Sequence, residues 1–255
     1  MHRAIVRKPA PNFSEGLTTA SLGAPDYEQA LSQHQFYCEA LERCGLLVTN
    51  LEPDHAYPDS TFVEDTAVVV GEVVVLTRPR AASRTDEVAI VAETLKQFFS
   101  RVETIQDPGR LDGGDVCEAG SHYFIGISER TNETGARQLG QFLKTLGHTC
   151  SFIDIRGIDG LLHLKSGVAF LGDNRFVVID SLARLKEFSD YQLVRVAEGE
   201  EYAANCLRIN EHVLIAEGYS RLAETLASLG YQTIALNMSE FQKMDGGLSC
   251  LSLRF

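Results

Sequence analysis

Apolar and polar positions alternate along this chain in a pattern that repeats itself. Short apolar runs of β type, such as Val68–Val70 and Val73–Leu76, flank the tight turn Gly71-Glu72 and predict a β-hairpin. Segments with apolar residues at helical spacing follow several such hairpins and predict helices. The expected helices run from an N-cap at Asp26 to about Cys44, then Glu87–Phe99, Asn132–Leu146 and Ser220–Leu229.

The hairpin pattern returns three more times after Leu76. Its later copies are Leu111–Cys117 with Tyr123–Ile127, Leu162–Leu171 with Phe176–Ile179, and Tyr202–Ile209 with Val213–Ile215. Polar residues mark matching places in the copies: Asp65, Asp115 and Lys165 lie 50 residues apart, and Asn205 and Gly247 follow after 40 and 42. Internal periods of about 40–50 residues indicate a propeller or a repeat array.

The last stretch, Asp245–Phe255, is a fifth copy that contains only its first strand. Its apolar positions alternate after a Gly-Gly turn, so we expect a β-strand there. Its hairpin partner would be the apolar strand His2–Val6 near the start of the chain. Leu46–Leu51 is a further expected strand. Five units completed in this way predict a closed ring, with the two ends of the chain side by side in one domain over residues 1–255.

Composition narrows the class of protein. The 255 residues are 44% apolar and 23% charged, as in ordinary soluble globular proteins, and the net charge of −12 argues against nucleic acid as a partner. No apolar stretch resembles a signal peptide or a membrane span. The six cysteines contain no CxxC motif and the seven histidines do not cluster. We therefore expect a cytoplasmic protein with reduced thiols, no metal and no contact with a membrane.

In a closed ring, the loops that enter each unit point toward the common axis. They would gather one set of polar residues around a central cavity: Asp59, Glu64, Asp65, Asp112, Asp115, His163, Asn205 and Cys250. A cysteine, a histidine and a carboxylate from separate repeats form the arrangement of nucleophile, base and orienting group. Cys250 would attack as a thiolate, His163 would protonate the leaving group and then activate water, and Asp112 would hold the imidazole.

The other carboxylates, Asp59, Glu64 and Asp65, would make the cavity anionic, so its ligand is expected to be a cation. A guanidinium matches this set because its planar donors pair with carboxylates in a bidentate way. A cysteine facing a guanidinium carbon suggests substitution at that carbon with loss of an amine.

Each of these residues also has a purely structural interpretation. Cys250 could be a small core residue in a C-terminal strand, and His163 a core histidine between two leucines. The aspartates of Asp112-Gly-Gly-Asp115 could be turn residues, and Glu64-Asp65 an exposed strand edge. Cys206 and Cys117 are competing thiols, but we expect both to be structural because they lie in apolar strands rather than at a Gly-Gly turn.

Several motifs together resemble the dimethylarginine dimethylaminohydrolase family of the guanidine-modifying, or pentein, superfamily. The motifs are Pro58–Asp65, Leu111–Val116, Ser128–Asn132, Leu162–Ser166, Tyr202–Cys206 and Asp245–Cys250, and they occur in order over nearly the whole chain. The resemblance implies an α/β fold, a five-bladed propeller of pseudo-fivefold symmetry closed by its N- and C-terminal strands. It also implies hydrolysis of ω-N-methylated arginine to citrulline and a methylamine, through a covalent S-alkylthiouronium intermediate on Cys250 and without a cofactor.

The resemblance also implies roles in substrate binding. Asp59 and Asp65 would receive the charged end of the substrate, and Phe62 would pack against it. Glu64 is a further predicted binding residue, from the anionic lining of the cavity. Arg84 and Arg130 would pair with the α-carboxylate. Leu17 would cap a mobile lid, and carbonyl groups at Met244 and Asp245 would receive the α-ammonium.

Other members of the family carry a glutamate at the position of Asp112, so the local geometry around His163 is expected to differ. In a cavity lined by carboxylates the pKa of the Cys250 thiol should be raised, so that the thiolate forms once the cationic substrate binds. The alternatives are an arginine or agmatine deiminase, which releases ammonia, and a catalytically inactive binding relative. The only expected partner is the small-molecule substrate, bound by a monomer or a homodimer.

Overall fold

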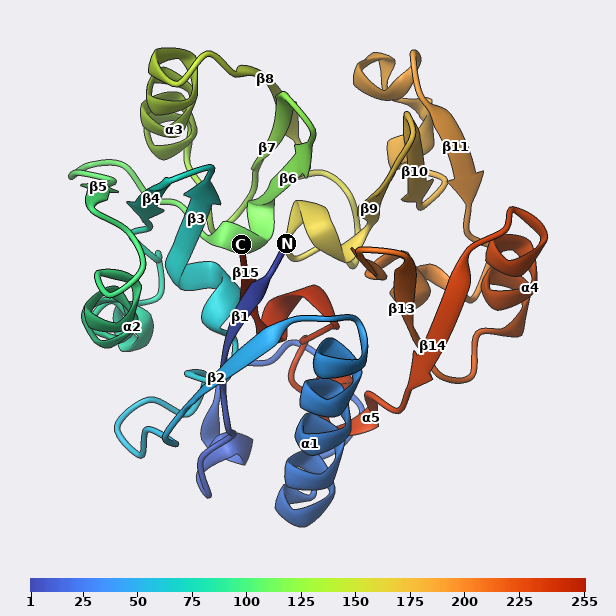
Figure 1. Ribbon diagram of the computed structural model, residues 1–255, viewed down its shortest axis with the longest axis horizontal. Coiled ribbons are helices and arrows are strands. Elements are labelled where there is room, and N and C mark those ends of the chain that lie inside the picture. Colours follow the sequence, from blue (N-terminus) through green and yellow to red (C-terminus); the bar gives the residue numbers. More distant parts are fainter.

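Five three-stranded β-sheets stand around a common axis in the computed structural model, which describes residues 1–255 (Figure 1). The sheets have the strand orders β15-β1-β2, β3-β4-β5, β6-β7-β8, β9-β10-β11 and β12-β13-β14. In each sheet the middle strand pairs antiparallel with the strand nearest the axis and parallel with the outer strand. The predicted ring of five α/β units is confirmed.

The strands are short. Their bounds are β1 (Arg3–Arg7), β2 (Leu47–Leu51), β3 (Ala67–Val70), β4 (Val73–Leu76), β5 (Arg101–Thr104), β6 (Val116–Ala119), β7 (His122–Ile127), β8 (Thr149–Asp154), β9 (Val168–Gly172), β10 (Arg175–Val178), β11 (Gln192–Arg195), β12 (Leu207–Ile209), β13 (His212–Ala216), β14 (Gln232–Leu236) and β15 (Leu253–Arg254).

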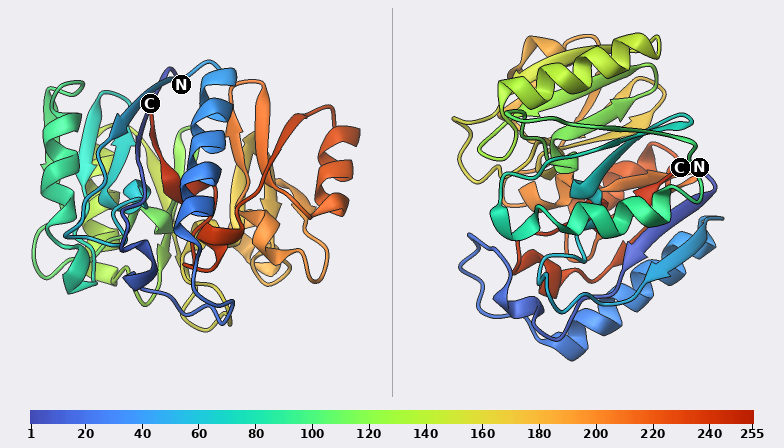
Figure 2. Two further views of the ribbon diagram at one scale, coloured as in Figure 1. Left: turned by 90° about the horizontal axis from the view of Figure 1, so that it is seen from below. Right: turned by 90° about the vertical axis from the view of Figure 1, so that its left-hand side faces the viewer.

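The ring closes through the pairing of β1 with β15. Ala4 lies opposite Arg254 and Ile5 opposite Leu253 in antiparallel register. Both ends of the chain therefore lie side by side at one end of the axis, as the views in Figures 1 and 2 agree. This closure was predicted from the fifth copy of the repeat, which has no second strand of its own.

Helices cover the outside of the ring (Figure 1). They are α1 (Tyr27–Arg43), α2 (Glu87–Leu95), α3 (Glu133–Thr145), α4 (Ser220–Ser228) and the short α5 (Ser239–Gln242). The side chain of Asp26 caps α1 by accepting a hydrogen bond from Gln29 N, and Asn132 caps α3 in the same way from Gly135 N. Helix α2 ends at Leu95, before the predicted Phe99, because Phe98 and Phe99 both bond back to Leu95 and turn the chain.

The sequence pattern missed four of the outer strands, β5, β8, β11 and β14. Parallel pairing requires a crossover between middle and outer strand, and helices α2, α3 and α4 provide it in three units. In the unit of β9, β10 and β11, two 3-10 turns, Leu182–Arg184 and Lys186–Phe188, take the place of the helix. The outer strands mix polar and apolar residues and are only partly buried, so their sequences lack a clear β signal.

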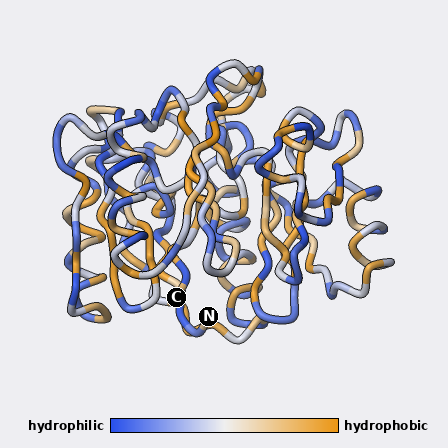
Figure 3. The backbone as a smooth tube through the Cα atoms, turned by 90° about the horizontal axis from the view of Figure 1, so that it is seen from above, coloured by the Kyte–Doolittle hydropathy of each residue, from blue (hydrophilic) through white to orange (hydrophobic).

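The apolar core lies between neighbouring sheets and beneath the helices. Phe124, Phe176 and Phe188 are almost fully buried and pack against one another in its largest cluster. Figure 3 shows apolar positions recurring along the strands, whereas the loops carry many polar ones. No helix combines the length and the apolar character that crossing a bilayer requires.

A short 3-10 turn precedes the inner strand of every unit. We call these five segments the axial turns: Val63–Thr66, Gly113–Asp115, Leu164–Ser166, Glu201–Ala204 and Ser249–Leu251. The last of them corrects the sequence-based expectation of a continuous strand after the Gly-Gly turn. Cys250 lies in a 3-10 turn, and only Leu253–Arg254 is strand.

Candidate active site

The axial turns are bonded to one another by the polar residues that mark the sequence repeat. Gly114 N donates to Asp65 Oδ1, Leu164 N to Asp115 Oδ1, and Ser249 N to Asn205 Oδ1, each at 2.9 Å. Each of these acceptors satisfies a backbone amide of the next turn around the ring. The repeat in the sequence therefore corresponds to a hydrogen-bonded scaffold, and Asp115 and Asn205 serve that scaffold.

A small cavity of about 30 Å³ lies at the end of the axis opposite the chain termini. It is lined by most of the residues that the sequence predicted for the site: Leu17, Asp59, Phe62, Asp65, Arg84, Arg130, His163, Met244, Asp245 and Cys250, together with Leu162 and Gly246. The nucleophile candidate and the acid/base candidate thus share one cavity although they come from different units.

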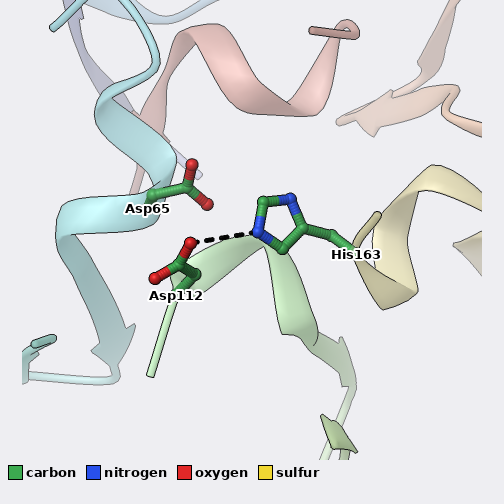
Figure 4. Close-up of side chains that lie close together, drawn as sticks. All are labelled: Asp65, Asp112 and His163. Carbon is green, nitrogen blue, oxygen red and sulfur yellow. Dashed lines mark hydrogen bonds and ion pairs between the residues drawn. The ribbon is translucent and has the colours of Figure 1, made fainter. Parts of the chain in front are cut away.

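His163 is held by Asp112. Its Nε2 donates to Oδ2 of Asp112 at 3.1 Å, since a carboxylate can only accept (Figure 4). This leaves Nδ1 on the other side of the ring for a substrate. Burial lowers the pKa of His163, but Asp65, Asp115 and Asp112 raise it more, to about 9. The imidazole is therefore held as a cation that can donate a proton.

Asp112 is fully buried beneath the imidazole, and its Oδ1 has no hydrogen-bond partner. The backbone N of Asp112 donates a hydrogen bond to Thr131 Oγ1, in the neighbouring loop, at 3.1 Å. The sequence predicted Asp112 as the group that orients His163, and the structure brings the two side chains together.

Asp65 lies beside this pair and between two cations. Its Oδ2 accepts from Arg84 Nη1 at 2.6 Å, and Figure 4 shows its carboxylate near the imidazole of His163. Burial raises the pKa of Asp65, but His163 and Arg84 lower it more, to about 2. Asp65 is thus an ionised carboxylate at neutral pH and can face a cationic substrate.

Asp65, Asp112 and His163 each place a potential ligand atom within 4.8 Å of the others. A metal ion could approach this group only at the expense of existing bonds. The carboxylate of Asp65 already accepts hydrogen bonds from Arg84 and from Gly114 N. The Nε2 of His163 already donates to Asp112. The donor set therefore favours a hydrogen-bonded cluster over a dedicated metal site.

Cys250 is partly exposed to the cavity, and its Sγ accepts a hydrogen bond from Gly247 N at 3.4 Å. Burial, Glu64 and Asp65 raise the pKa of Cys250 to about 12, and the Gly247 amide and Lys165 offset them only in part. Only glycine fits at position 247, because a Cβ there would lie 2.6 Å from Asn205 Oδ1. The thiol is therefore protonated in the empty site.

A lid covers the cavity from the loop that contains Leu17. The backbone N of Leu17 donates to both oxygens of Asp59, at 3.0 and 3.2 Å. Thr19 donates to Oδ2 of Asp245 through its backbone N at 2.5 Å and its hydroxyl at 3.0 Å. Burial raises the pKa of Asp59. Leu17 itself remains 43% exposed, so the lid is held by its backbone rather than by apolar packing.

Phe62 and Met244 form the apolar part of the wall. The ring of Phe62 packs in a cluster with Phe13 and Phe241, at centroid distances of 5.9 and 6.4 Å. The carbonyl oxygens of Met244 and Asp245 accept no hydrogen bond within the chain, so they are free for an ammonium group.

Two arginines line the cavity in different states. Arg130 forms no ion pair within the chain, whereas buried Arg84 is bound by Asp65 and Glu87. Arg84 also donates through Nη2 to the carbonyl oxygen of Phe62 at 3.0 Å. Most of its donors are therefore occupied, and Arg130 is the better placed of the two for a carboxylate.

Glu64 corrects the sequence-based prediction. It was expected to bind substrate, but it does not line the cavity and points to the opposite side of its turn. Its Oε1 lies 2.6 Å from Lys165 Nζ and 2.9 Å from Arg254 Nη2, and its Oε2 accepts from Ser249 Oγ at 2.7 Å. Glu64 thus belongs to the floor beneath Cys250.

Sequence reasoning missed Glu87, Ser249 and Arg254 as partners of site residues. Glu87 was seen only as the start of a helix, although its place three residues after Arg84 was a signal for an ion pair. The other thiols agree with their structural interpretation. Cys117 and Cys206 are 4% and 2% exposed, and burial raises the pKa of both to about 12.

Comparisons with known proteins find relatives that match nearly the whole chain. The family model described as arginine deiminase matches residues 54–195. An N(G),N(G)-dimethylarginine dimethylaminohydrolase from Pseudomonas aeruginosa is 42% identical over 252 residues, which cover 98% of this chain and 98% of that protein.

Two solved structures are similar over 100% of this chain and 99% of theirs, each at 41% identity and a TM-score of 0.96. One is a cysteine-to-serine variant of the Pseudomonas aeruginosa protein with citrulline. The other is a histidine-to-glycine variant of a dimethylarginine dimethylaminohydrolase, as an adduct with S-methyl-L-thiocitrulline.

Proposed function

Because the chain belongs to the dimethylarginine dimethylaminohydrolase family, we propose that it hydrolyses ω-N-methylated arginine to citrulline. Asymmetric dimethylarginine releases dimethylamine in this reaction, and monomethylarginine releases methylamine. The observation that carries the proposal is the cavity itself, where Cys250 and His163 face one small space with the carboxylates of Asp59 and Asp65. A planar cation with apolar methyl groups fits this lining.

In the first half of the reaction we assign the nucleophile to Cys250 and the acid to His163. Binding of the cationic substrate favours loss of the Cys250 thiol proton to solvent. The thiolate Sγ then forms a bond to the guanidinium carbon and gives a tetrahedral adduct. His163 then donates its proton to the methylated nitrogen, the C–N bond breaks, and a neutral amine leaves. The product on the enzyme is an S-alkylthiouronium cation on Cys250.

In the second half His163, now neutral, takes a proton from water, and the water oxygen bonds to the same carbon. The C–S bond breaks, Cys250 leaves as a thiolate, and the remaining hydroxyl proton is lost as the carbonyl of citrulline forms. Asp112 keeps the imidazole in one orientation and stabilises its charged form through both halves. No cofactor takes part in this scheme.

The remaining residues hold the substrate. Asp59 and Asp65 would receive its guanidinium, and the ring of Phe62 would pack against it. The α-carboxylate would meet Arg130, with Arg84 as a secondary partner if substrate displaces one of its carboxylates. The free carbonyl oxygens of Met244 and Asp245 would accept from the α-ammonium, beneath the lid of Leu17.

We also propose that residues 1–255 act as one domain, since β15 completes the sheet of β1 and β2. A cytoplasmic location suits the six free cysteines. The active unit would be a monomer or a homodimer.

The test is citrulline release from asymmetric dimethylarginine, L-arginine and agmatine, side by side. We expect turnover of the methylated substrate and its loss in Cys250→Ser. A preference for L-arginine with release of ammonia would instead support arginine deiminase activity. That activity is the alternative to test because the matching family model is described as arginine deiminase. No citrulline from any of the three, with binding of dimethylarginine retained, would indicate an inactive binding relative and reject the hydrolase.

A further inference from the structure

A second, larger cavity occupies the other end of the propeller axis. It has a volume of about 430 Å³, and Met1, Leu253 and Arg254 are among its lining residues. It therefore lies at the end of the axis where Figures 1 and 2 show the two chain termini. We call it the rear chamber. Nothing in the hydrolytic mechanism uses this space, although its volume lies within the range of small-molecule sites.

The wall of the rear chamber is aliphatic. The inner strand of each of the five sheets contributes a residue to it: Val68 from β3, Val116 from β6, Val168 from β9, Leu207 from β12 and Leu253 from β15. Five aliphatic side chains around one axis offer contact to an extended hydrocarbon chain lying along it.

The floor of the rear chamber is cationic. Lys165 and Arg254 both pair with the same oxygen of Glu64, and their side chains are only 16% and 11% exposed. Two cations therefore share one carboxylate, which leaves one positive charge without a counter-ion in a mostly dry place.

Hydrogen-bond donors are also left over at the floor. The Nζ of Lys165 carries three N–H donors, and Glu64 takes only one of them within the chain. Arg254 Nε is buried without a partner. At the rim, Arg208 is paired with Asp173. The exposed Glu118 is the other carboxylate that lines the chamber, and it forms no ion pair with Lys165 or Arg254, so Glu64 is the one carboxylate bonded to the floor cations.

From this arrangement we propose that the rear chamber binds an aliphatic monocarboxylate of medium chain length, with its carboxylate at Lys165 and Arg254 and its chain along the aliphatic wall. One negative charge neutralises the floor, and a carboxylate can accept from the spare donors of Lys165. A dianion such as a phosphate ester would bring a second charge close to Glu64. A neutral chain would leave the cationic floor uncompensated.

A ligand bound in the rear chamber should affect the ionisation of Cys250 through the residues of the floor. Glu64 contacts Lys165 on one side and Ser249, the neighbour of Cys250, on the other. Lys165 lowers the pKa of Cys250. A carboxylate bound at Lys165 weakens that effect, so it should reduce the thiolate fraction of Cys250 at a given pH.

The test uses octanoate as the probe, with octan-1-ol and octylammonium as controls of the same chain length, by titration calorimetry of the full chain. Octanoate is expected to bind Cys250→Ser saturated with citrulline as tightly as it binds the free protein, because the two cavities are separate. Displacement of octanoate by citrulline would overturn the proposal.

Two variants test the two parts of the rear chamber. Lys165→Gln removes a floor charge and should weaken octanoate binding at least tenfold. Val69→Phe fills part of the wall at a half-buried position and should weaken binding while citrulline formation stays unchanged. Octanoate binding that is undiminished in both, or octylammonium that binds as well as octanoate, would overturn the proposal.

The effect on the nucleophile is measured by alkylation of Cys250 with iodoacetamide at fixed pH. Octanoate should slow the alkylation severalfold in the unmodified chain and have no such effect in Lys165→Gln. An equal slowing in both would contradict binding at Lys165.

Discussion

At the catalytic end of the propeller axis, buried carboxylates outnumber the buried cations Arg84 and His163, whereas at the rear end two cations share one carboxylate. At the catalytic end, Asp65 is bonded to Arg84 and lies beside His163, and His163 is also bonded to Asp112. At the rear, Glu64 alone serves Lys165 and Arg254. Glu64 and Asp65 are neighbours in one axial turn, so a single turn supplies the counter-ion to both ends.

This difference shows how a repeat scaffold is divided between two tasks. Three of the five pairs of neighbouring axial turns are joined by a backbone amide that donates to a side-chain oxygen. The other two are joined by bonds from the side chains of Asn205 and Ser249. What differs is which side chains of each turn face the lid and which face the rear. The hydrogen bonds of the scaffold hold both sets in place.

After the loss expected for Cys250→Ser, the largest effect on turnover is expected from Asp112→Asn. Loss of the carboxylate should lower kcat by roughly 10²-fold or more, because His163 loses its orienting partner and acid/base catalysis contributes about that much. Since Asp112 raises the pKa of His163, the limb of the pH profile that reports His163 should move to lower pH. Asp112→Glu should restore most of the rate, and an Asn variant with an unmoved profile and near-normal kcat would contradict this role.

Next in size is the effect of Glu64→Gln on stability. The change leaves Lys165 and Arg254 mostly buried without a counter-ion, and breaking such a pair costs about 3 kcal/mol of unfolding free energy. Urea denaturation measures it. Glu118→Gln, at the exposed rim of the same chamber, is the matched control and should change stability by less than about 0.5 kcal/mol. Equal losses in both variants would show that the floor is not a special charge cluster.

The pH dependence of the free thiol tests the catalytic end. A group whose pKa is raised to about 12 is protonated at neutral pH, and its reactive thiolate increases about tenfold per pH unit as the pH rises. Alkylation of Cys250 should therefore accelerate from pH 7 to pH 9 without a plateau. A cationic substrate analogue such as arginine should stabilise the thiolate. A plateau near neutral pH in the free protein would show that the thiol is already ionised.

The smallest effect is expected from Asp245→Asn at the lid. Asparagine tolerates the backbone φ of 57° at this position and still accepts from Thr19, but without a charge. KM should rise severalfold and kcat should change little, because the lid closes less firmly. Thr19→Val should add little to Asp245→Asn if the two act through one contact. Additive effects in the double variant would place the role of Asp245 elsewhere.

The sequence predicted those parts of the fold that leave a pattern in neighbouring residues or a repeated spacing. Hairpins, the helix cap at Asp26, and the closure of the ring all follow from spacing and turn residues, and the structure agrees with them. The outer strands were missed because their side chains are half exposed and of mixed polarity. Parallel pairing to a distant middle strand leaves no local mark.

The candidate site was predictable in part for a related reason. Polar residues at the entry of each unit converge wherever a ring closes, so Cys250, His163 and Asp65 could be grouped from sequence. Which way each residue of a short turn points could not. Glu64 was wrongly placed with Asp65 because adjacent residues in a 3-10 turn face different directions. The spacing of Glu87 three residues after Arg84 did indicate an ion pair, but it could not show that this pair is buried at the wall of the cavity.

The closure of the ring by β1 and β15 has a consequence for folding. Ala4 and Arg254 lie almost a whole chain apart, so their pairing has a large loop-closure entropy and should form late. The turn that carries Cys250 directly precedes β15. The nucleophile is therefore brought to His163 by the same event that joins the ring. In a refolding experiment, return of catalytic activity should lag behind recovery of helical circular dichroism.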